Sequence, residues 1–231
     1  MKLAIMQPYF LPYIGYFQLV AAVDVFIIYD NIKYTKKGWI NRNRLLLEGR
    51  DSLFSLPLKK DSDSLNIDKR VIAAEFNRKK LMNQFKGAYA CAPYFAQTYS
   101  LLEQIVHNKE NNLFEFIRSS IEVVCDHLDI KTEIQVSSAI AIDHDLKNEE
   151  KILALCDAVG ACTYINAIGG IGLYSPQKFK SRGIELRFMQ TKHREYPQFG
   201  NGFVPNLSIV DVMMFNDTQK CTKLLEEYDL V

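Results

Sequence analysis

The sequence predicts an α/β protein with a Rossmann-like, mostly parallel sheet and a helical insertion. Short apolar runs rich in β-branched residues alternate with segments of helical periodicity, a pattern typical of parallel strands joined by helices. Residues 70–130 show mostly helical periodicity, which predicts the insertion at about that place. The chain has 231 residues, of which 48% are hydrophobic, and can bury a large core. We therefore expect a single domain over residues 1–231.

The first unit of the predicted fold is a strand, a helix and a second strand. Leu3–Met6 is a short apolar run, and Val25–Tyr29 is another, bounded by Asp24 and Asp30. Between them, Tyr16–Val23 is apolar enough to form a buried helix. These elements within about 30 residues predict a βαβ unit with adjacent parallel strands and a right-handed crossover.

The later elements continue the alternation of strands and helices. Leu53–Leu58 is predicted as a third strand. Within the helical stretch, apolar residues such as Ile117, Ile121 and Val124 recur at three- and four-residue steps. The remaining expected elements are a strand at Ile134–Val136, a helix at Glu149–Val159, a strand at Thr163–Asn166, a glycine-rich loop at 169–172, a helix at Pro176–Arg182, a strand at Ile184–Met189 and a helix that Ser208 begins near Ile209–Phe215.

Composition excludes several classes of protein. Lys and Arg total 28 and Asp and Glu total 27, so the net charge of +1 gives no field to hold a long nucleic acid. The five cysteines are dispersed and odd in number, which favours reduced thiols in a cytoplasmic protein. The histidines lie at no ligand spacing to them, so we expect no metal site. We also expect no signal peptide and no membrane partner. The oligomeric state stays open.

The loop that follows the first predicted strand is the first candidate site. In an open parallel sheet, ligands bind beyond the carboxyl ends of the strands. Gly15 at a helix start allows close backbone approach, and the helix N-terminus offers N–H groups to an anion. Tyr9, Tyr13 and Tyr16 could stack on a base or sugar, or could simply pack. Gln7, at a strand end, is harder to explain by packing.

The loop over residues 30–44 is the second candidate, and it is the most basic stretch of the chain. Arg and Lys could bind phosphates here, and Asn could hydrogen-bond sugar hydroxyls, although such a run could also be a solvated surface. The binding residues predicted in this loop are Lys33, Lys37, Trp39, Asn41, Arg42, Asn43 and Arg44. A third loop, over residues 166–174, adds Gly169 and Gly170. His193 is a further polar candidate late in the chain.

Three segments carry a resemblance to a known family. MQPYFLPYIGYFQLVAAVDVFIIYDNIKYTKKGWINRNR, YINAIGGIGLYSPQKF and FVPNLSIVDVMMFN together resemble the WbqC-like proteins, and the likeness covers nearly the whole chain. The resemblance implies a place among bacterial surface-polysaccharide genes, those of the lipopolysaccharide O-antigen. It implies this context more firmly than any reaction.

A second similarity concerns mechanism. Nucleotidylyltransferases and pantothenate-synthetase-like ligases carry an HxGH motif after their first strand, and Tyr13-Ile14-Gly15-Tyr16 stands at that position here. In those enzymes the histidines stabilise charge on the displaced phosphate. A tyrosine is a donor but not a cation at pH 7. The similarity therefore favours binding of a nucleotide more than cleavage of ATP.

The function predicted from the sequence is acyl or aminoacyl transfer to the amine of a nucleotide-linked amino sugar. Gln7, Tyr13 and Tyr16 would hold the reacting groups, and Asp30 or His193 would accept the amine proton. Phosphates would be held by Lys33, Lys37, Arg42 and Arg44. The alternatives are a nucleotidyltransferase acting on a small molecule and a non-catalytic nucleotide-sugar binding protein. No cofactor is assigned, although an ATP-dependent version would use magnesium. The acyl donor and the sugar are not specified.

Overall fold

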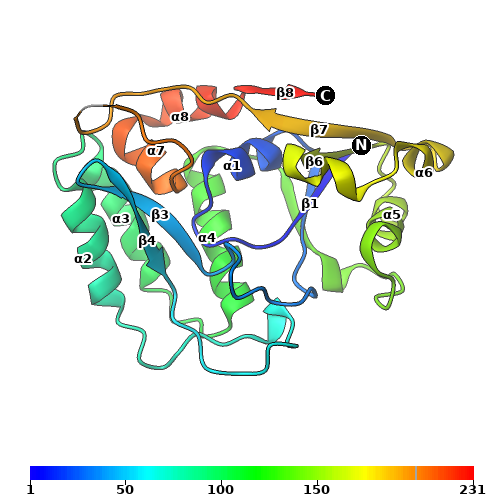
Figure 1. Ribbon diagram of the computed structural model, residues 1–231, viewed down its shortest axis with the longest axis horizontal. Helices are drawn as coiled ribbons and strands as arrows, with labels where there is room; N and C mark the ends of the chain where they lie inside the picture. The colour runs from blue at the N-terminus through cyan, green and yellow to red at the C-terminus, as the bar shows by residue number, and fades with distance from the viewer. Residues whose placement is uncertain (201) are drawn as a thin grey trace.

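A six-stranded sheet forms the centre of the molecule, which a computed structural model describes over residues 1–200 and 202–231 (Figure 1). The strand order is β5-β2-β1-β6-β7-β8. All neighbouring pairs are parallel except β7 and β8, so the predicted mostly parallel α/β sheet is confirmed. The strands are β1 (Lys2–Met6), β2 (Val25–Ile28), β5 (Glu133–Val136), β6 (Thr163–Ala167), β7 (Glu185–Thr191) and β8 (Tyr228–Leu230).

The first βαβ unit has the predicted geometry. β1 and β2 are parallel neighbours, with Leu3 opposite Val25, and helix α1 (Ile14–Ala21) joins them. On its other side β1 pairs with β6, a strand that comes much later in the chain. The direction in which strands are added therefore reverses between β1 and β6. Such a reversal opens a crevice beyond the carboxyl ends of the strands, which is where open α/β sheets bind ligands.

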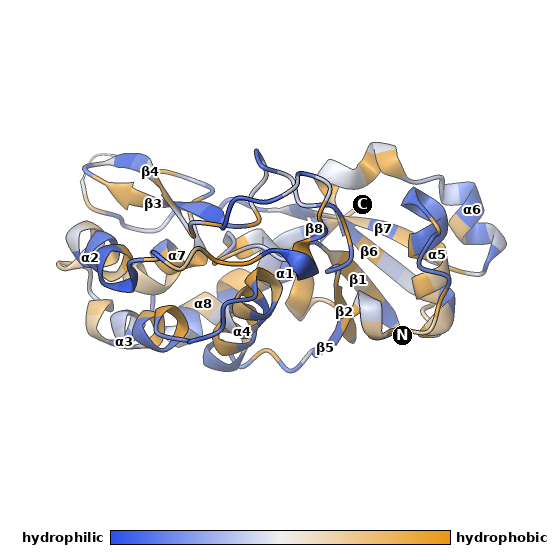
Figure 2. Cartoon of the chain, turned by 90° about the horizontal axis from the view of Figure 1, so that it is seen from below, coloured by the Kyte–Doolittle hydropathy of each residue, from blue (hydrophilic) through white to orange (hydrophobic). Residues whose placement is uncertain are grey.

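Helices cover both faces of the sheet (Figure 2). On one face, α5 (Asn148–Ala158) and α6 (Pro176–Ser181) pack on alternate strand residues such as Leu3 and Ile27. On the other face, Ala4 and Phe26 belong to a larger apolar cluster. The helices of that larger cluster are α1, α2 (Arg78–Tyr89), α3 (Phe95–Val106), α4 (Leu113–His127), α7 (Ile209–Phe215) and α8 (Thr218–Leu225).

The third predicted strand does not join the sheet. Strand β4 (Arg50–Ser55) pairs antiparallel with β3 (Arg42–Leu47) in a separate hairpin, so the expected strand at Leu53–Leu58 starts earlier and has a local partner. The hairpin turns at Glu48 and Gly49, whose φ angles are 51° and 74°. Positive φ at both turn residues matches the twist of a tight hairpin. The carboxyl end of the basic loop is therefore strand, not loop.

The helical stretch lies where it was predicted. Helices α2, α3 and α4 come between β4 and β5 in the chain. Asn77 and Asn112 cap α2 and α4, each accepting a hydrogen bond from a backbone N–H in the first turn. Short 3-10 turns stand at η1 (Ile67–Lys69), η2 (Ser137–Ala139) and η3 (Ile168–Leu173), the last being the predicted glycine-rich loop.

Two broader observations concern thiols and membranes. All five cysteines lie within the described residues and are free. Within the same residues, no helix combines the length and the apolar character that a membrane span requires.

The loop between β1 and α1 is held by segments far away in the sequence. Leu11 is fully buried and has a φ of 45°, an uncommon backbone conformation for a branched side chain. Its carbonyl oxygen accepts hydrogen bonds from Asn43 Nδ2 at 2.8 Å and Ser208 Oγ at 2.7 Å. The backbone N–H of Ile209 also donates to the carbonyl of Pro12 at 2.7 Å. The start of α7 and the hairpin together fix this loop.

We expect Ser208→Ala to lower the free energy of unfolding by about 1–2 kcal/mol, because it removes both a donor to a buried carbonyl and the cap of α7. Denaturant unfolding of the two proteins measures this. Thr222→Ala is the matched control, since its hydroxyl donates to a backbone carbonyl on an exposed helix. If Ser208→Ala lowered the free energy of unfolding no more than Thr222→Ala, Ser208 would not hold the loop between β1 and α1.

Candidate functional site

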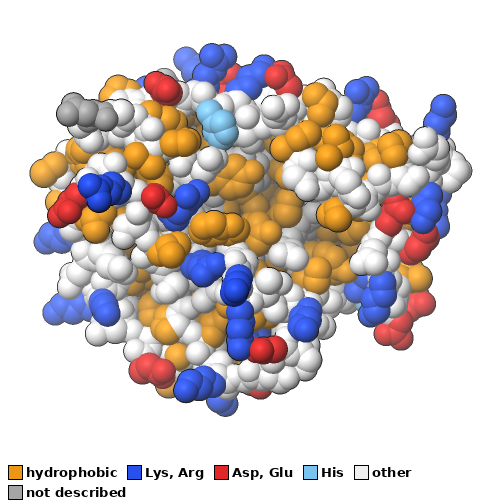
Figure 3. All heavy atoms as spheres, in the orientation of Figure 1, with side chains coloured by type: hydrophobic (Ala, Val, Ile, Leu, Met, Phe, Trp, Pro, Cys, Tyr) orange, Lys and Arg blue, Asp and Glu red, His pale blue; other side chains and the backbone are white. Residues whose placement is uncertain are grey.

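The three predicted loops follow β1, β2 and β6, whose carboxyl ends lie at the same edge of the sheet. Figure 3 shows a hollow near the middle of this side of the molecule, with apolar side chains inside it and Lys and Arg side chains below it. Among the described residues, no group of three or more His, Cys, Asp and Glu side chains is placed to hold a metal ion. The polar side chains around the strand ends define the candidate site.

Gln7 stands at the end of β1 with two tyrosines around it. The Tyr9 hydroxyl lies 3.4 Å from Gln7 Oε1, and the Tyr16 hydroxyl donates to the backbone carbonyl of Gln7 at 3.2 Å. Tyr16 is 2% exposed, and burial raises the pKa of its hydroxyl well above the usual value. Its hydroxyl is thus used within the fold, while the half-buried Gln7 and Tyr9 side chains keep some exposure.

Tyr13 fills the space in front of Gly15. A Cβ built on Gly15 would lie 2.3 Å from Tyr13 Cε2 and 2.5 Å from Thr191 Oγ1. Thr191 ends β7; burial raises the pKa of the Tyr13 hydroxyl, and the Thr191 side chain acts in the opposite direction. Glycine is therefore required here so that the tyrosine can pack across the helix start against the strand.

Asp30 is buried at the end of β2, with 2% of its surface exposed. Its Oδ1 atom accepts hydrogen bonds from Ser137 Oγ and from the Ser138 N–H, both at 3.0 Å. No hydrogen bond from the described residues reaches Oδ2. The Ser137 hydroxyl also lies 2.7 Å from Asn31 Oδ1. One carboxylate oxygen is therefore held by the turn after β5, and the other is free to accept a proton or a hydrogen bond.

Lys151 is a second buried charge in this region, and it was not among the residues predicted from the sequence. It is 4% exposed, its Nζ donates to the His144 carbonyl at 3.2 Å, and it lies 5.2 Å from the centre of the Tyr29 ring. Burial lowers the pKa of its ammonium group, and the charge of Asp30 acts in the opposite direction. One feature of the sequence could have identified Lys151: it is a lysine within the buried apolar face of α5, next to Ile152.

His144 has a supporting role in the same region. Its Nδ1 lies 3.0 Å from Asn31 Nδ2, and its Nε2 lies 3.0 Å from the Ile140 carbonyl. An amide nitrogen donates and a carbonyl accepts, so in these contacts Nδ1 accepts and Nε2 donates. Both ring nitrogens are used, and the ring holds Asn31 beside Asp30.

The asparagines of the basic segment donate hydrogen bonds to backbone carbonyls elsewhere in the fold. Asn41 accepts from the Tyr34 hydroxyl at 2.8 Å and donates to the Leu56 carbonyl at 2.7 Å. Asn43 is buried and donates to Leu11, as described above. These two side chains brace the loop and the hairpin against each other.

The cations of the basic segment divide into two groups. Arg42 donates to the carbonyls of Gly38 and Lys37, while Arg44 pairs with Asp51 at 3.3 Å and donates to the Asn206 carbonyl. Both guanidinium groups also lie over the ring of Trp39, which is 42% exposed. By contrast, Lys33 and Lys37 are exposed and make no ion pair with the described residues.

His193 lies apart from the Asp30 cluster, in the segment that follows β7. It is exposed and lines a small cavity together with Tyr13, Gln18 and Tyr196. The structure therefore brings His193 close to Tyr13. Tyr196 itself points inward and donates to the buried Asp211 at 2.6 Å.

The glycine-rich turn η3 stands over the end of β6. A Cβ on Gly170 would meet Asn166 Nδ2 at 2.9 Å, whereas nothing lies within 4 Å of one on Gly169. Ile171 and Leu173 on the same turn are 56% and 69% exposed. Gly170 thus lets the turn fold closely over Asn166, while the aliphatic side chains of the turn face outward.

Comparison with known proteins places the chain in a family. The model of the WbqC-like protein family matches residues 7–223. The chain belongs to the WbqC-like family. It is similar to the uncharacterized protein Rv1507c of Mycobacterium tuberculosis (strain ATCC 25618 / H37Rv), at 30% identity over 220 residues and 93% of each chain. No solved structure matches it.

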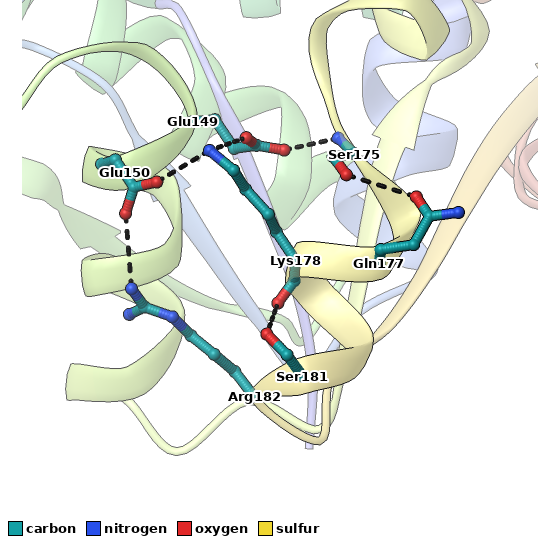
Figure 4. A network of polar contacts seen from close by, with 7 residues as sticks. All are labelled: Glu149, Glu150, Ser175, Gln177, Lys178, Ser181 and Arg182. Atoms are coloured by element: carbon teal, nitrogen blue, oxygen red, sulfur yellow. Dashed lines mark hydrogen bonds and ion pairs between the residues drawn. The ribbon is translucent and has the colours of Figure 1, made fainter.

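An ion-pair network fixes the segment that follows η3 in this WbqC-like protein (Figure 4). Glu149 on α5 accepts a hydrogen bond from the Ser175 N–H and pairs with Lys178 at 2.9 Å. Glu150 pairs with Lys178 at 2.9 Å and with Arg182 at 3.4 Å. The Ser175 N–H, followed by Lys178, holds the pKa of the Glu149 carboxyl below its usual value.

We expect Gly15→Ala to destabilise the fold by about 1–3 kcal/mol, because the methyl group would displace the Tyr13 ring. Thermal unfolding measures the effect. Gly87→Ala is the control: no atom lies within 4 Å of its Cβ in helix α2, so we expect a gain of about 0.5–1 kcal/mol. Equal effects at the two positions would show that Tyr13 does not occupy this space.

We expect the Glu149 charge to stabilise the fold only above acidic pH. Its pKa in the folded chain lies below 4.5, so its stabilisation is present above that pH and is lost as the pH falls through the folded-state pKa. Glu149→Gln should therefore be less stable than the unsubstituted chain at pH 7, by about 1 kcal/mol or less, and this difference should shrink as the pH falls below 4.5. Urea unfolding at several pH values tests this, with the exposed Glu195→Gln as control.

Proposed function

We propose that this WbqC-like protein is an enzyme that transfers an acyl or aminoacyl group to the amine of a nucleotide-linked amino sugar, in surface-polysaccharide precursor synthesis. The observation that carries the proposal is the Asp30 carboxylate, buried at a strand end with one oxygen held and the other unbonded. A buried carboxylate with a free oxygen, beside a buried ammonium group, suits proton transfer from an amine.

The chemistry would be amide formation from an activated acyl donor, a thioester or an acyl phosphate. The amine nitrogen attacks the acyl carbon, the C–N bond forms, and Asp30 takes the amine proton. The bond to sulfur or to the phosphate oxygen then breaks, and the leaving group departs with the electron pair. Lys151 would face the acyl oxygen, where negative charge develops in the transition state. Its ammonium has a single hydrogen-bond partner in the described residues, which leaves donors free.

Residues of the first loop would orient the reacting groups. Gln7 and Tyr9 lie side by side at the end of β1 and retain exposed surface. Tyr13 would stand near the acceptor, with His193 across the small cavity. In this proposal Tyr16 acts through Gln7, because its hydroxyl is buried against the Gln7 carbonyl.

Nucleotidyl transfer is the second candidate, since Tyr13 and Tyr16 hold the two histidine positions of an HxGH loop. Both hydroxyls have raised pKa values and are neutral near pH 7. The Tyr16 hydroxyl is already bonded to a backbone carbonyl. These contacts favour acyl transfer over attack on a nucleoside triphosphate.

We expect nucleoside diphosphate sugars to raise the melting temperature, since a ligand at 100 times its Kd adds about 2.7 kcal/mol. Asp30→Asn should retain this binding within a few-fold and lose turnover by about 10²-fold or more, measured as amide product by mass spectrometry.

Asp24→Asn is the matched control, because Asp24 bounds the opposite end of β2 and accepts from the Lys2 N–H. Normal turnover in Asp30→Asn would refute the role of this carboxylate. Binding without turnover of any acyl donor would indicate a binding protein. Pyrophosphate release from ATP alone would instead support nucleotidyl transfer.

A further inference from the structure

Arg70 is a buried cation without an acidic partner. The charged side chains buried in the described part of the chain are Asp30, Arg70, Lys151 and Asp211. Asp211 accepts three hydrogen bonds and Asp30 accepts two. Arg70 is 4% exposed, and no carboxylate of the described residues pairs with it. A buried charge is costly unless it is paired, so its neighbourhood favours an incoming anion.

The contacts of Arg70 leave much of its guanidinium unbonded. Nη1 donates to the Ser62 carbonyl at 2.9 Å, and Cζ lies 4.5 Å from the centre of the Tyr34 ring. Nε is buried and has no hydrogen-bond partner, and no partner for Nη2 is found among the described residues. The aromatic ring and the carbonyl hold the guanidinium in place, while the donors of Nη2 have no partner among the described residues.

Further cations surround the same ring. Arg70, Arg42 and Lys36 lie close enough to the Tyr34 hydroxyl to lower its pKa, against the larger effect of burial, which raises it. The acid that faces them is Asp63. Its pKa is lowered first by its hydrogen bond to Lys36, and the charges of Arg70 and Lys33 act in the same direction. Lys36 and Asp63 pair at 2.7 Å, and both side chains are more than 60% exposed, at 66% and 64%.

This cluster is continuous with the Asp30 region. Backbone pairing joins Lys33 to Asn66, and the Tyr34 N–H donates to the Leu65 carbonyl at 3.1 Å. In the same segment, the Asp68 N–H donates to the carbonyl of Asp30 at 3.3 Å. The loop that carries Arg70 therefore lies against the loop that begins with Asp30. Arg42 and Arg44, which the sequence analysis assigned to phosphate, are engaged by backbone carbonyls and Asp51.

We propose that Arg70, Lys33 and Lys36 form the subsite for the diphosphate of the nucleotide-linked substrate, and that Asp63 occupies this subsite as an internal counter-ion which the diphosphate displaces. The inference rests on the proposed function for the identity of the substrate. The binding of a diphosphate to this cluster can be measured without any acyl transfer.

The physical reason is the difference in charge and in the number of acceptor oxygens between the two occupants. Asp63 offers a single negative charge on an exposed side chain, and among the described residues it reaches only Lys36 within ion-pair distance. A diphosphate brings several charges and many acceptor oxygens, and it can engage the planar fork of Arg70 as well as both lysines. The diphosphate gains more free energy by pairing with a buried guanidinium than by pairing with an exposed ammonium group.

The test is calorimetric titration of the full chain with inorganic pyrophosphate and with inorganic phosphate at low salt. We expect saturable binding of pyrophosphate, tighter than that of phosphate. Arg70→Met should weaken it about tenfold or more, which corresponds to the loss of about one charge-assisted contact. Lys33→Met should weaken it less, and Asp63→Asn should strengthen it by removing the competing carboxylate.

Arg78→Met is the matched control. Arg78 also lies over an aromatic ring, that of Phe76 at 5.0 Å, donates to a backbone carbonyl and has an unbonded Nε, but it stands on helix α2. Its substitution should leave the affinity within twofold. If Arg70→Met fails to fold, Lys33→Met and Asp63→Asn decide the question, because both positions are on the surface.

Two results would overturn the subsite. One is the absence of saturable pyrophosphate binding in the unsubstituted chain. The other is an affinity that Lys33→Met and Asp63→Asn leave unchanged, or that Arg70→Met and Arg78→Met change equally. Pyrophosphate binding with the expected pattern, in a chain that makes no amide, would retain the subsite and reject the proposed reaction.

Discussion

The carbonyl oxygen of Leu11 is the contact on which the geometry of the site depends. It accepts from the Asn43 amide and the Ser208 hydroxyl, which stand 32 and 197 positions away in the sequence. Leu11 is fully buried in a left-handed backbone conformation, which costs free energy that the surrounding structure must offset. The loop after β1, the hairpin and the start of α7 are therefore joined through a single buried acceptor. Gln7 and Tyr13 are placed by that junction.

A second buried acceptor extends the same constraint. Asp211, on α7, accepts hydrogen bonds from Tyr89, Tyr196 and Gln198. The Tyr89 hydroxyl in turn accepts from the N–H of Leu46 in the hairpin. Burial raises the pKa of the Asp211 carboxyl, and its three donors oppose that shift. Through Asp211, the segment FVPNLSIVDVMMFN helps to hold the loops of the site in place. This segment also carries part of the family resemblance. Its side chains act through packing and hydrogen bonds.

A different constraint applies to the two buried charges Asp30 and Lys151. Asp30 and Lys151 are both buried, yet no ion pair joins them within the described residues. Asp30 Oδ2 has no hydrogen bond from the described residues, and Lys151 Nζ has one partner there, the His144 carbonyl. Groups arranged in this way reduce stability and are retained where binding or catalysis uses them. This is the physical ground for placing the function at this edge of the sheet.

Local pattern was sufficient for most of the helices and strands and for the loops that follow β1, β2 and β6. Apolar runs and helical periodicity depend on neighbouring residues, so β1, β2, β6 and α5 could be predicted, and with them the loops at the strand ends. The pairing of β3 with β4, the helix α8 and the edge strand β8 were not predicted. The tertiary structure alone separated side chains that brace the fold, such as Tyr16 and Asn43, from those that keep unbonded donors in the described part of the chain, such as Lys151 and Arg70. A hydrogen-bond partner can stand more than a hundred positions away, as Ser137 does from Asp30. Such a partner cannot be recognised from the periodicity of the sequence.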